Sequence, residues 1–487
     1  MKTIFLLLIL LIGQSFCQQL PIVVSNSEKL TGYEELSDFL SSIEGKHKFG
    51  KINVIGKTVE GRNIYSFEFS KEGINPNTYR LKVLVFAQQH GNEHSGKEAA
   101  IMLISDFVDG KFDPLLENLD IAIIPQINPD GSEKDKRRNG NNADLNRNHL
   151  TLTQPESIAL HNYFNKILFD LTLDVHEYFP FSSDWRNFGF YKIADEQLGL
   201  LTNPNISTAI KKFSKEQLYP FVEKYLIDKG FRFNEYIVGG PPNIERLRHS
   251  TTDINDGRQS FGIQGSLSFI LEGINGEKNS ADGIEKRSKG QYEAIVGLLN
   301  IANKKHEEIK TLVKNERDYI VNKKSTLSLR GDHFNNGQIF RFPVRDAFKG
   351  IDTIISSQNY NPVVKSLLDI DVPIGWLIPK NDSKLNSLIT YHNIKSEELE
   401  SRAEIIEYEI TSLDSIFLEG EWLRDVKIKE TLKSDLNLSE YFFLPSKQIK
   451  KITLNLAFHP QSMHSIIQYD DFEYLLRNKI YPIKMVR

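Results

Sequence analysis

The sequence has a single cysteine, Cys17, among its 487 residues. Before it, Lys2 and an apolar run at 4–12 form the pattern of a secretory signal peptide. The run is too short to cross a bilayer, so we expect cleavage after Cys17 and a secreted or periplasmic protein. Lipid attachment at Cys17 is the alternative, which the bulky Phe16 disfavours. After cleavage the chain could form no disulfide and would offer no thiolate ligand or nucleophile.

An excess of charge of either sign is also missing. Lysine and arginine number 60, aspartate and glutamate 64, and the formal net charge at pH 7 is −4. This balance predicts no nucleic-acid partner and no polybasic membrane surface. After the signal segment no apolar run is long enough to span a bilayer, so we expect no stable membrane insertion.

Four apolar runs carry the fold prediction. The run at 81–87 does not alternate between apolar and polar residues, which indicates a strand buried on both faces. Similar runs lie at 119–127, 170–175 and 266–271, and helical patterns such as 97–108 separate them. Strands that alternate with helices predict an α/β fold whose mostly parallel or mixed sheet is covered by helices on both faces.

Polar residues follow each of these runs. His90 and Glu93 come after the first run, Asn128 after the second, His176 after the third and Glu272 after the fourth. Because α/β sheets bind ligands at the carboxyl ends of their strands, we expect these side chains to lie close together. Imidazole nitrogens and carboxylate oxygens suit zinc. The pattern therefore predicts a metal-dependent site.

Taken in order, the motifs resemble a known family. They are HGNE at 90–93, NPDG at 128–131, DLNRN at 144–148 and DVH at 174–176, followed by Glu272. From about residue 31 to residue 273 they are similar, in order and spacing, to the zinc metallocarboxypeptidases of the carboxypeptidase A and B type. The resemblance implies one zinc ion per chain and hydrolysis of the C-terminal bond of a peptide with a free C-terminal carboxylate.

The resemblance also implies a role for each matched residue at the metal. His90, Glu93 and His176 would hold the zinc ion and leave one position open, as a catalytic zinc site requires. Asp144 would accept a hydrogen bond from the other ring nitrogen of His90 and so fix its orientation. Glu272 would be the general base that takes a proton from the attacking water.

Other matched residues would bind the substrate. Arg137 would stabilise the oxyanion at the scissile carbonyl, and its spacing to Asn146 favours it over the neighbouring Arg138. Asn146 and Arg147 would bind the terminal carboxylate, which the planar guanidinium fits at two points. Asp174, two residues before the last metal ligand and on the same side of the strand, is a possible hydrogen-bond partner.

The sequence departs from the family in one place. The family often has a tyrosine upstream of the general base, at the position where this chain has Ser250. Tyr236 is the nearest tyrosine before it and is too far away to assign. Arg258 lies near the expected floor of the specificity pocket. If it points inward it would favour an acidic terminal side chain, whereas a lone loop arginine is usually at the surface.

Two other functions stay open at this point. A zinc amidohydrolase of the aspartoacylase or succinylglutamate desuccinylase type shares HxxE, an Asn-Arg pair and the general-base glutamate, but it acts on small N-acyl amino acids. The NPDG turn and the signal segment favour the peptidase. A catalytically inactive, carboxylate-binding homologue is the second alternative, which the intact ligands and base disfavour.

Composition divides the chain into parts. We expect a signal peptide at 1–17, a zinc carboxypeptidase catalytic domain at 18–310 and a smaller C-terminal accessory domain, α/β or β-rich, at 325–487. A long, highly charged helical stretch at 291–321 leads from one domain to the next. The accessory domain contains His459 and His464, and because no ligand spacing repeats there we expect both at the surface.

Overall fold

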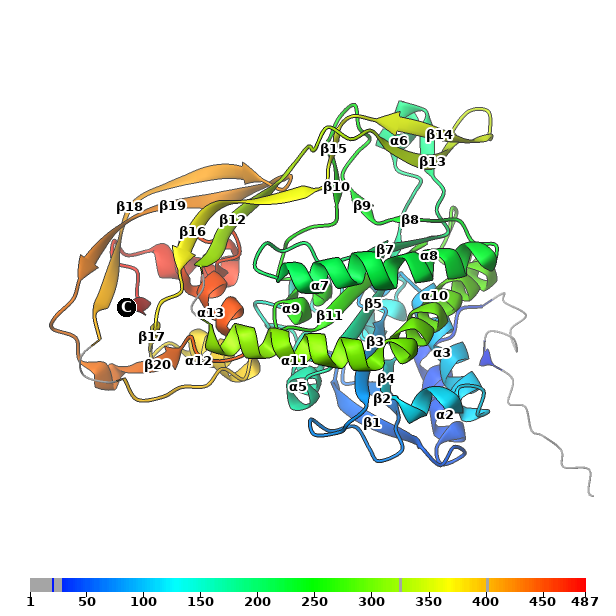
Figure 1. Ribbon diagram of the computed structural model, residues 1–487, viewed down its shortest axis with the longest axis horizontal. Helices are drawn as coiled ribbons and strands as arrows, with labels where there is room; N and C mark the ends of the chain where they lie inside the picture. Colours follow the sequence, from blue (N-terminus) through cyan, green and yellow to red (C-terminus); the bar gives the residue numbers. More distant parts are fainter. Residues whose placement is uncertain (1–19, 22–28, 324–325, 400–402) are drawn as a thin grey trace, which may run out of the picture.

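The computed structural model describes residues 20–21, 29–323, 326–399 and 403–487. The predicted signal peptide at 1–17 lies outside the described residues and stays a prediction. Among the described helices, none has the length and apolar character needed to cross a membrane. Figure 1 shows a large part built around a central sheet and a smaller part that contains the C-terminal end of the chain.

The large part is organised by a mixed sheet of 8 strands in the order β1-β2-β4-β3-β5-β11-β7-β8. Strands β4, β3, β5 and β11 run parallel to their neighbours in this block, whereas β1 and β2 on one side and β7 on the other join it by antiparallel pairing. The strands are β1 (Gly50–Lys57), β2 (Asn63–Phe69), β3 (Leu81–Ala87), β4 (Leu119–Ile124), β5 (Leu171–Tyr178), β7 (Glu196–Gly199), β8 (Phe233–Glu235) and β11 (Leu267–Ile274). The predicted α/β class with a mixed sheet is confirmed.

Helices cover both faces of this sheet because its strands are apolar on both sides. In β3, Val83 and Val85 belong to the core shared with α3, whereas Leu84 and Phe86 belong to the core shared with α5. The helices of this part are α2 (Tyr33–Ile43), α3 (Ser95–Val108), α4 (Pro129–Ser132), α5 (Pro155–Ile167), α6 (Ser183–Phe188), α7 (Thr208–Phe213), α8 (Tyr219–Asp228), α9 (Gly257–Gly262), α10 (Ile284–Lys304) and α11 (His306–Asn322).

Two helical stretches are interrupted, one of them predicted. The charged stretch at 291–321 is not one helix but the end of α10 and most of α11, which Lys305 separates with φ −109° and ψ 15°. The helical stretch after Ser207 contains a π-turn, Ser214–Leu218, just before Pro220 at the start of α8. Proline offers no backbone N–H, which explains a local change of hydrogen-bond pattern at that point.

Hydrogen-bonded strands cross the predicted domain boundary. Strand β13 pairs with β6, and β15 pairs with β10, so residues after 325 complete small sheets that residues before 310 begin. The strands are β6 (Phe190–Lys192), β9 (Ile237–Val238), β10 (Leu247–His249), β12 (Thr326–Phe334), β13 (Phe340–Asp346), β14 (Asp352–Ser357), β15 (Tyr360–Asn361) and β16 (Val363–Asp371). The domain limits themselves stay a prediction.

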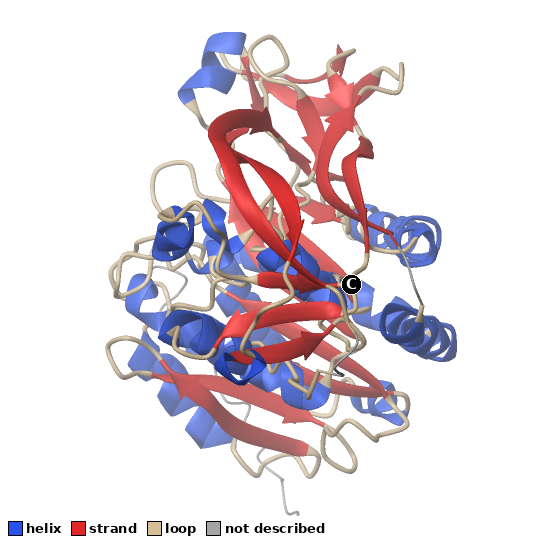
Figure 2. Cartoon of the chain, turned by 90° about the vertical axis from the view of Figure 1, so that its left-hand side faces the viewer, coloured by secondary structure: helices blue, strands red, loops and turns tan. Residues whose placement is uncertain are grey.

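The C-terminal part holds a 5-stranded sheet in the order β19-β18-β21-β17-β20. Figure 2 views the molecule from this side, so that the part lies in front of the central sheet. Its elements are β17 (Gly375–Pro379), α12 (Ser383–Tyr391), β18 (Ile405–Leu418), β19 (Glu421–Leu432), β20 (Tyr441–Pro445), α13 (Lys451–Phe458) and β21 (Lys484–Val486). Strands β18 and β19 form a long hairpin whose turn lies at 419–420.

The C-terminal part shares an apolar cluster with the large part. Buried residues such as Trp376 and Tyr408 belong to the same apolar cluster as the side chains on the α3 face of the central sheet. The prediction that His459 and His464 lie at the surface is wrong, because their exposed fractions are 2% and 4%. The ring of His459 packs against Trp376 and Tyr408, which explains why an imidazole is tolerated there.

Candidate metal centre

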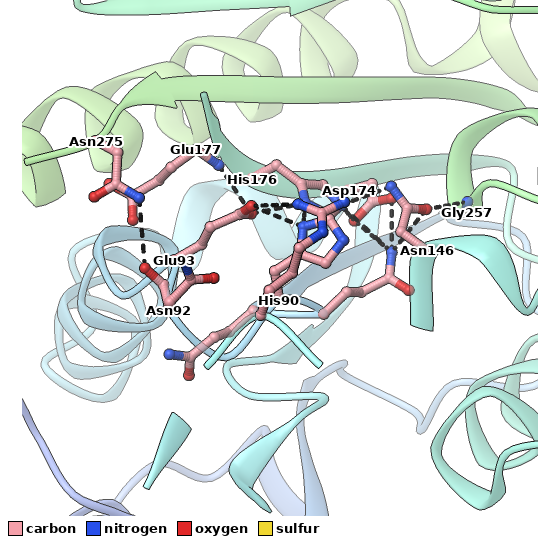
Figure 3. Close-up of polar contacts among 12 residues, drawn as sticks. His90, Asn92, Glu93, Asn146, Asp174, His176, Glu177, Gly257 and Asn275 are labelled. Atoms are coloured by element: carbon pink, nitrogen blue, oxygen red, sulfur yellow. Dashed lines mark hydrogen bonds and ion pairs between the residues drawn. The ribbon is translucent and has the colours of Figure 1, made fainter. Parts of the chain in front are cut away.

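Three predicted metal ligands converge at the carboxyl ends of β3 and β5. His90 Nδ1 lies 2.7 Å from Glu93 Oε1, and His176 Nδ1 lies 2.9 Å from Glu93 Oε2. The two imidazole Nδ1 atoms are 3.1 Å apart. All three side chains are buried, and Figure 3 shows them pointing toward one another.

Carboxylates behind the two histidines set their tautomers. His90 Nε2 lies 3.0 Å from Asp144 Oδ1, and His176 Nε2 lies 2.9 Å from Asp174 Oδ1. When both rings are neutral, as metal binding requires, each Nε2 donates its proton to a carboxylate, and both Nδ1 atoms then have lone pairs that face the oxygens of Glu93. Lone pairs repel one another unless a cation lies among them. Two nitrogens on a tetrahedral zinc ion, at about 2.05 Å each, would be about 3.3 Å apart, so these residues fit zinc.

The local backbone explains why the ligands meet. Gly91 packs so closely on the NPDG turn that a Cβ atom there would lie 2.2 Å from the carbonyl carbon of Gly131. Asn128 holds this turn, because its side chain donates to Gln89 O at 3.0 Å and accepts from Gly131 N at 2.9 Å. The sequence pattern predicts that Asn128, at the end of a strand, lies near the metal ligands, and the structure gives it this supporting contact with the turn.

Glu272 lies beside the metal ligands. It is paired in register with His176 across β11 and β5 and is 7% exposed. Burial raises the pKa of Glu272 to about 7, the Glu93 charge adds to this effect, and His176, His90 and Arg137 oppose it. A buried carboxylate with a pKa near neutrality is suited to general-base chemistry.

The structure separates the two candidate arginines. Arg137 donates through Nε to Asp144 Oδ2 at 3.1 Å, and its Nη1 lies 3.5 Å from Glu93 Oε1. Arg138 instead is exposed and donates to Asn142 O at 3.0 Å. Arg137 therefore lies beside the ligands, and Arg138 does not.

Asn146 and Arg147 follow the ligand-orienting Asp144 on a single helical turn, Leu145–Arg147. Asn146 is buried, and its Oδ1 accepts from Gly257 N at 2.8 Å (Figure 3). Arg147 is exposed, donates to Asn146 O at 2.7 Å and forms no ion pair within 4.0 Å with any residue that the structure describes. An arginine with free donors beside a metal site is a ready partner for an anionic ligand.

The comparisons with known proteins agree with this geometry. The model of the zinc carboxypeptidase family matches residues 36–179, which include all three predicted metal ligands. These residues belong to the zinc carboxypeptidase family. The named relatives are carboxypeptidases, and the class that they and the family indicate for this chain is a metallocarboxypeptidase, a hydrolase.

Relatives of this zinc carboxypeptidase domain come from distant organisms. Carboxypeptidase 2 of Trichophyton rubrum is 23% identical over 438 residues, which cover 85% of this chain and 78% of that protein. Human carboxypeptidase D is 32% identical over 165 residues, 28% of this chain and 12% of that protein. Four further fungal relatives are matched over 48–59% of their length. A metallo-carboxypeptidase structure from Burkholderia cenocepacia aligns with 56% of this chain and 69% of its own at a TM-score of 0.42 and 19% identity.

Ser250, at the position where the family often has a tyrosine, does not replace that tyrosine. Ser250 is fully buried, has φ +62° and cannot cover a substrate. Arg258, predicted as a substrate-binding residue, is 1% exposed and forms an ion pair with Asp256 at 2.8 Å. Its Nε and Nη1 atoms have no hydrogen-bond partner among the described residues. Arg258 is therefore not a surface residue, but Asp256 cancels much of its charge.

Two residues near the zinc carboxypeptidase site were not predicted. Burial and then Glu272 raise the pKa of Tyr236, whereas Arg258 and Arg147 oppose this, so the phenol lies within electrostatic range of three predicted site residues. Lys192 Nζ lies 4.9 Å from the centre of the Tyr178 ring. Burial lowers the pKa of Lys192 to about 8, and the charge of Glu272 opposes this shift. Both residues come from short strands or loops that carry no motif, so no sequence signal identified them.

Proposed function

We propose that the protein is a secreted zinc metallocarboxypeptidase that removes the C-terminal residue of peptides. The observation that carries the proposal is the pair of imidazole Nδ1 atoms 3.1 Å apart, facing the oxygens of Glu93. One zinc ion per chain, held by His90, Glu93 and His176, would supply the Lewis acidity that activates water and polarises a carbonyl.

The remaining chemistry belongs to side chains of this chain. The Glu272 carboxylate takes a proton from the water that attacks the peptide carbonyl, and passes it to the nitrogen of the departing residue as the C–N bond breaks. Arg137, held against Asp144, lies where it can donate to the carbonyl oxygen as negative charge develops on it. Burial of Glu272 supports this assignment because a weakly acidic carboxylate can both accept and return the proton.

Arg147 would direct the reaction to the C-terminal residue of the substrate peptide. Its guanidinium has no ion pair among the described residues, so the terminal carboxylate of a peptide could bind it without displacing an internal partner. Asn146, fixed by Gly257, would orient this contact. A preference for acidic terminal residues through Arg258 stays a prediction from the sequence, because the ion pair with Asp256 leaves little net charge to attract them.

The test is mass spectrometry of a mixed peptide pool incubated with the zinc-loaded protein, beside the same peptides with C-terminal amides. We expect stepwise loss of residues from the free acids only, and no loss when a chelator is present. Arg147→Gln should abolish the preference for free acids, whereas the matched control Arg138→Gln should retain it. Equal trimming of acids and amides, or release of acyl groups from acetyl-aspartate without peptide cleavage, would overturn the proposal.

A further inference from the structure

The C-terminal part meets the large part at Arg147, which follows Asp144, the partner of His90, by three positions. A cavity of about 370 Å³ opens beside this arginine. One side consists of Arg147 with Thr251 and Asp253 from the large part, and the other side comes from the C-terminal part. The second side is made by Leu418, Glu419, Glu421, Trp422, Leu423 and Arg424 of the β18–β19 hairpin and by Met463, His464, Gln468, Tyr469 and Asp470.

The hairpin turn is fixed in this position by specific bonds. Glu419, at the turn, accepts hydrogen bonds from the backbone and the hydroxyl of Thr252, the latter at 2.7 Å. Its carboxylate also pairs with His333 at 2.8 Å, and its carbonyl accepts from Arg248. Thr252 lies between two residues of the first wall, Thr251 and Asp253. The cavity is therefore enclosed by two segments that are bonded to each other.

From this geometry we infer that the C-terminal part completes the substrate site, and that the cavity receives the C-terminal residue of the peptide with its side chain against Trp422. This inference rests on the proposed carboxypeptidase function. It assigns a role to the part of the chain that the sequence motifs leave unexplained, since every matched motif ends by residue 273.

The chemistry of the lining indicates a large apolar or aromatic terminal side chain. Most charges other than Arg147 already have partners: Glu419 with His333, Asp253 with His464 at 3.7 Å, and Asp470 with Arg424 at 3.3 Å. Around them lie the apolar and aromatic side chains of Leu418, Trp422, Leu423, Met463 and Tyr469. The indole of Trp422 is 73% exposed and packs on Phe417 with ring centres 5.3 Å apart. An exposed indole gains most by covering an apolar group.

Glu421 is the residue that could alter this specificity. It is exposed at the start of β19 and lines the same cavity. If its charge governed the cavity, peptides ending in lysine would be preferred over those ending in phenylalanine. Such a preference, lost in Glu421→Gln, would overturn the apolar assignment.

Binding can be tested without turnover. The chain has 3 tryptophans, and Trp185 and Trp376 are buried at 5% and 0% exposure, so solvent quenchers report mainly on Trp422. We expect Gly-Phe to protect the emission from iodide, and Gly-Phe amide to give no protection. Trp422→Phe should remove the response. Equal protection by both dipeptides, or none by Gly-Phe, would overturn the inference.

Kinetics provide the second readout. Trp422→Ala should raise KM at least 10-fold for a peptide ending in phenylalanine and less than 3-fold for one ending in alanine. The matched control is Leu413→Ala, a change at an apolar side chain of the same hairpin that is 55% exposed and outside the cavity. A Trp422→Ala effect that is equal for both peptides overturns the inference, whereas a wild-type protein that cleaves neither peptide overturns the proposed function and leaves the quenching test to decide the cavity.

Discussion

Two groups of buried histidines lie close to each other in this molecule. The first is the metal pair, His90 and His176. The second, the histidine chain, consists of His149, His161 and His392. Gln89 joins them, because its Nε2 donates to Asp174 Oδ2 at 2.8 Å while its Oε1 accepts from His149 Nε2 at 2.7 Å.

The groups differ in what surrounds them. Burial lowers the pKa of His176, but the Asp174 and Glu93 carboxylates outweigh it and hold that pKa well above its ordinary value. Among the residues that the structure describes, no carboxylate contacts the histidine chain, and burial lowers the pKa of His149 to about 4 and of His392 to about 3. Carboxylates, not burial, therefore decide which imidazoles attract a cation.

The histidine chain behaves as a series of neutral donors and acceptors. His149 Nε2 donates a hydrogen bond to Gln89 Oε1. The Nδ1 atom of the neutral His149 ring can then only accept, and it accepts from His161 Nε2 at 3.0 Å. His161 Nδ1 then has no partner among the described residues, as a neutral ring with one proton predicts. His392 donates from Nε2 to Leu150 O at 2.7 Å.

The largest effect should come from removing a ligand of the metal pair. His176→Ala should reduce bound zinc from one ion per chain to none and lower kcat/KM by about 10³-fold or more. His161→Gln, in the histidine chain, keeps a donor toward His149 and should retain full zinc content. Zinc content by inductively coupled plasma mass spectrometry, with peptidase rates, checks both. Loss of zinc in His161→Gln would show that the two groups are not distinct.

An intermediate effect should follow from changing the carboxylate behind a ligand. Asp174→Asn removes the charge that fixes the His176 tautomer and should weaken zinc binding by about 10- to 100-fold. His149→Gln changes the partner of Gln89 Oε1 in the histidine chain. It should leave the zinc affinity within about 3-fold of the wild-type value. Competition with a chromogenic chelator measures both affinities. An unchanged affinity in Asp174→Asn would mean that the carboxylate does not distinguish the groups.

The smallest effect concerns Lys450, which lies in the same buried region as the histidine chain. Its Nζ donates to Asn165 Oδ1 at 2.7 Å, and burial lowers the pKa of Lys450 from 10.5 to about 7. Between these two values the unfolded chain binds more protons than the folded chain, so the free energy of unfolding rises with pH. Lys450→Met should reduce this rise by about 2 kcal/mol between pH 7 and pH 9.

Urea denaturation at the two pH values measures this slope. Loss of the hydrogen bonds of Lys450 lowers stability at both pH values, so the slope, not the absolute stability, is the informative quantity. Lys447→Met, at an exposed lysine three positions away, should leave the slope unchanged. If the free energy of unfolding rose equally with pH in wild type and in Lys450→Met, the result would contradict a neutral buried lysine.

The sequence predicted that His90 and His176 lie close together because each follows or ends a buried strand of the same sheet. His90 and Glu93 lie on one turn after a buried strand, and His176 and Glu272 lie on adjacent parallel strands of the same sheet. The predicted run at 81–87 coincides with the observed bounds of strand β3. The Asp174 contact also follows from strand periodicity.

The histidine chain and the substrate cavity could not be predicted in this way. His149, His161 and His392 come from separate elements, and no carboxylate marks them. Trp422 reaches Arg147 only because a hairpin from another part of the chain folds over the large part. His459 and His464 were placed at the surface because their burial depends on packing between distant segments. Contacts of this kind leave no periodic pattern in the sequence.

The β18–β19 hairpin also has a consequence for the order in which the chain is made. The predicted metal ligands and general base all precede residue 273, whereas the hairpin follows residue 404 and pairs with β21 at 484–486. Translation proceeds from the N-terminus, and early segments fold first. On the proposed function, the cavity beside Arg147 would therefore be completed only when the last strand of the chain has been made.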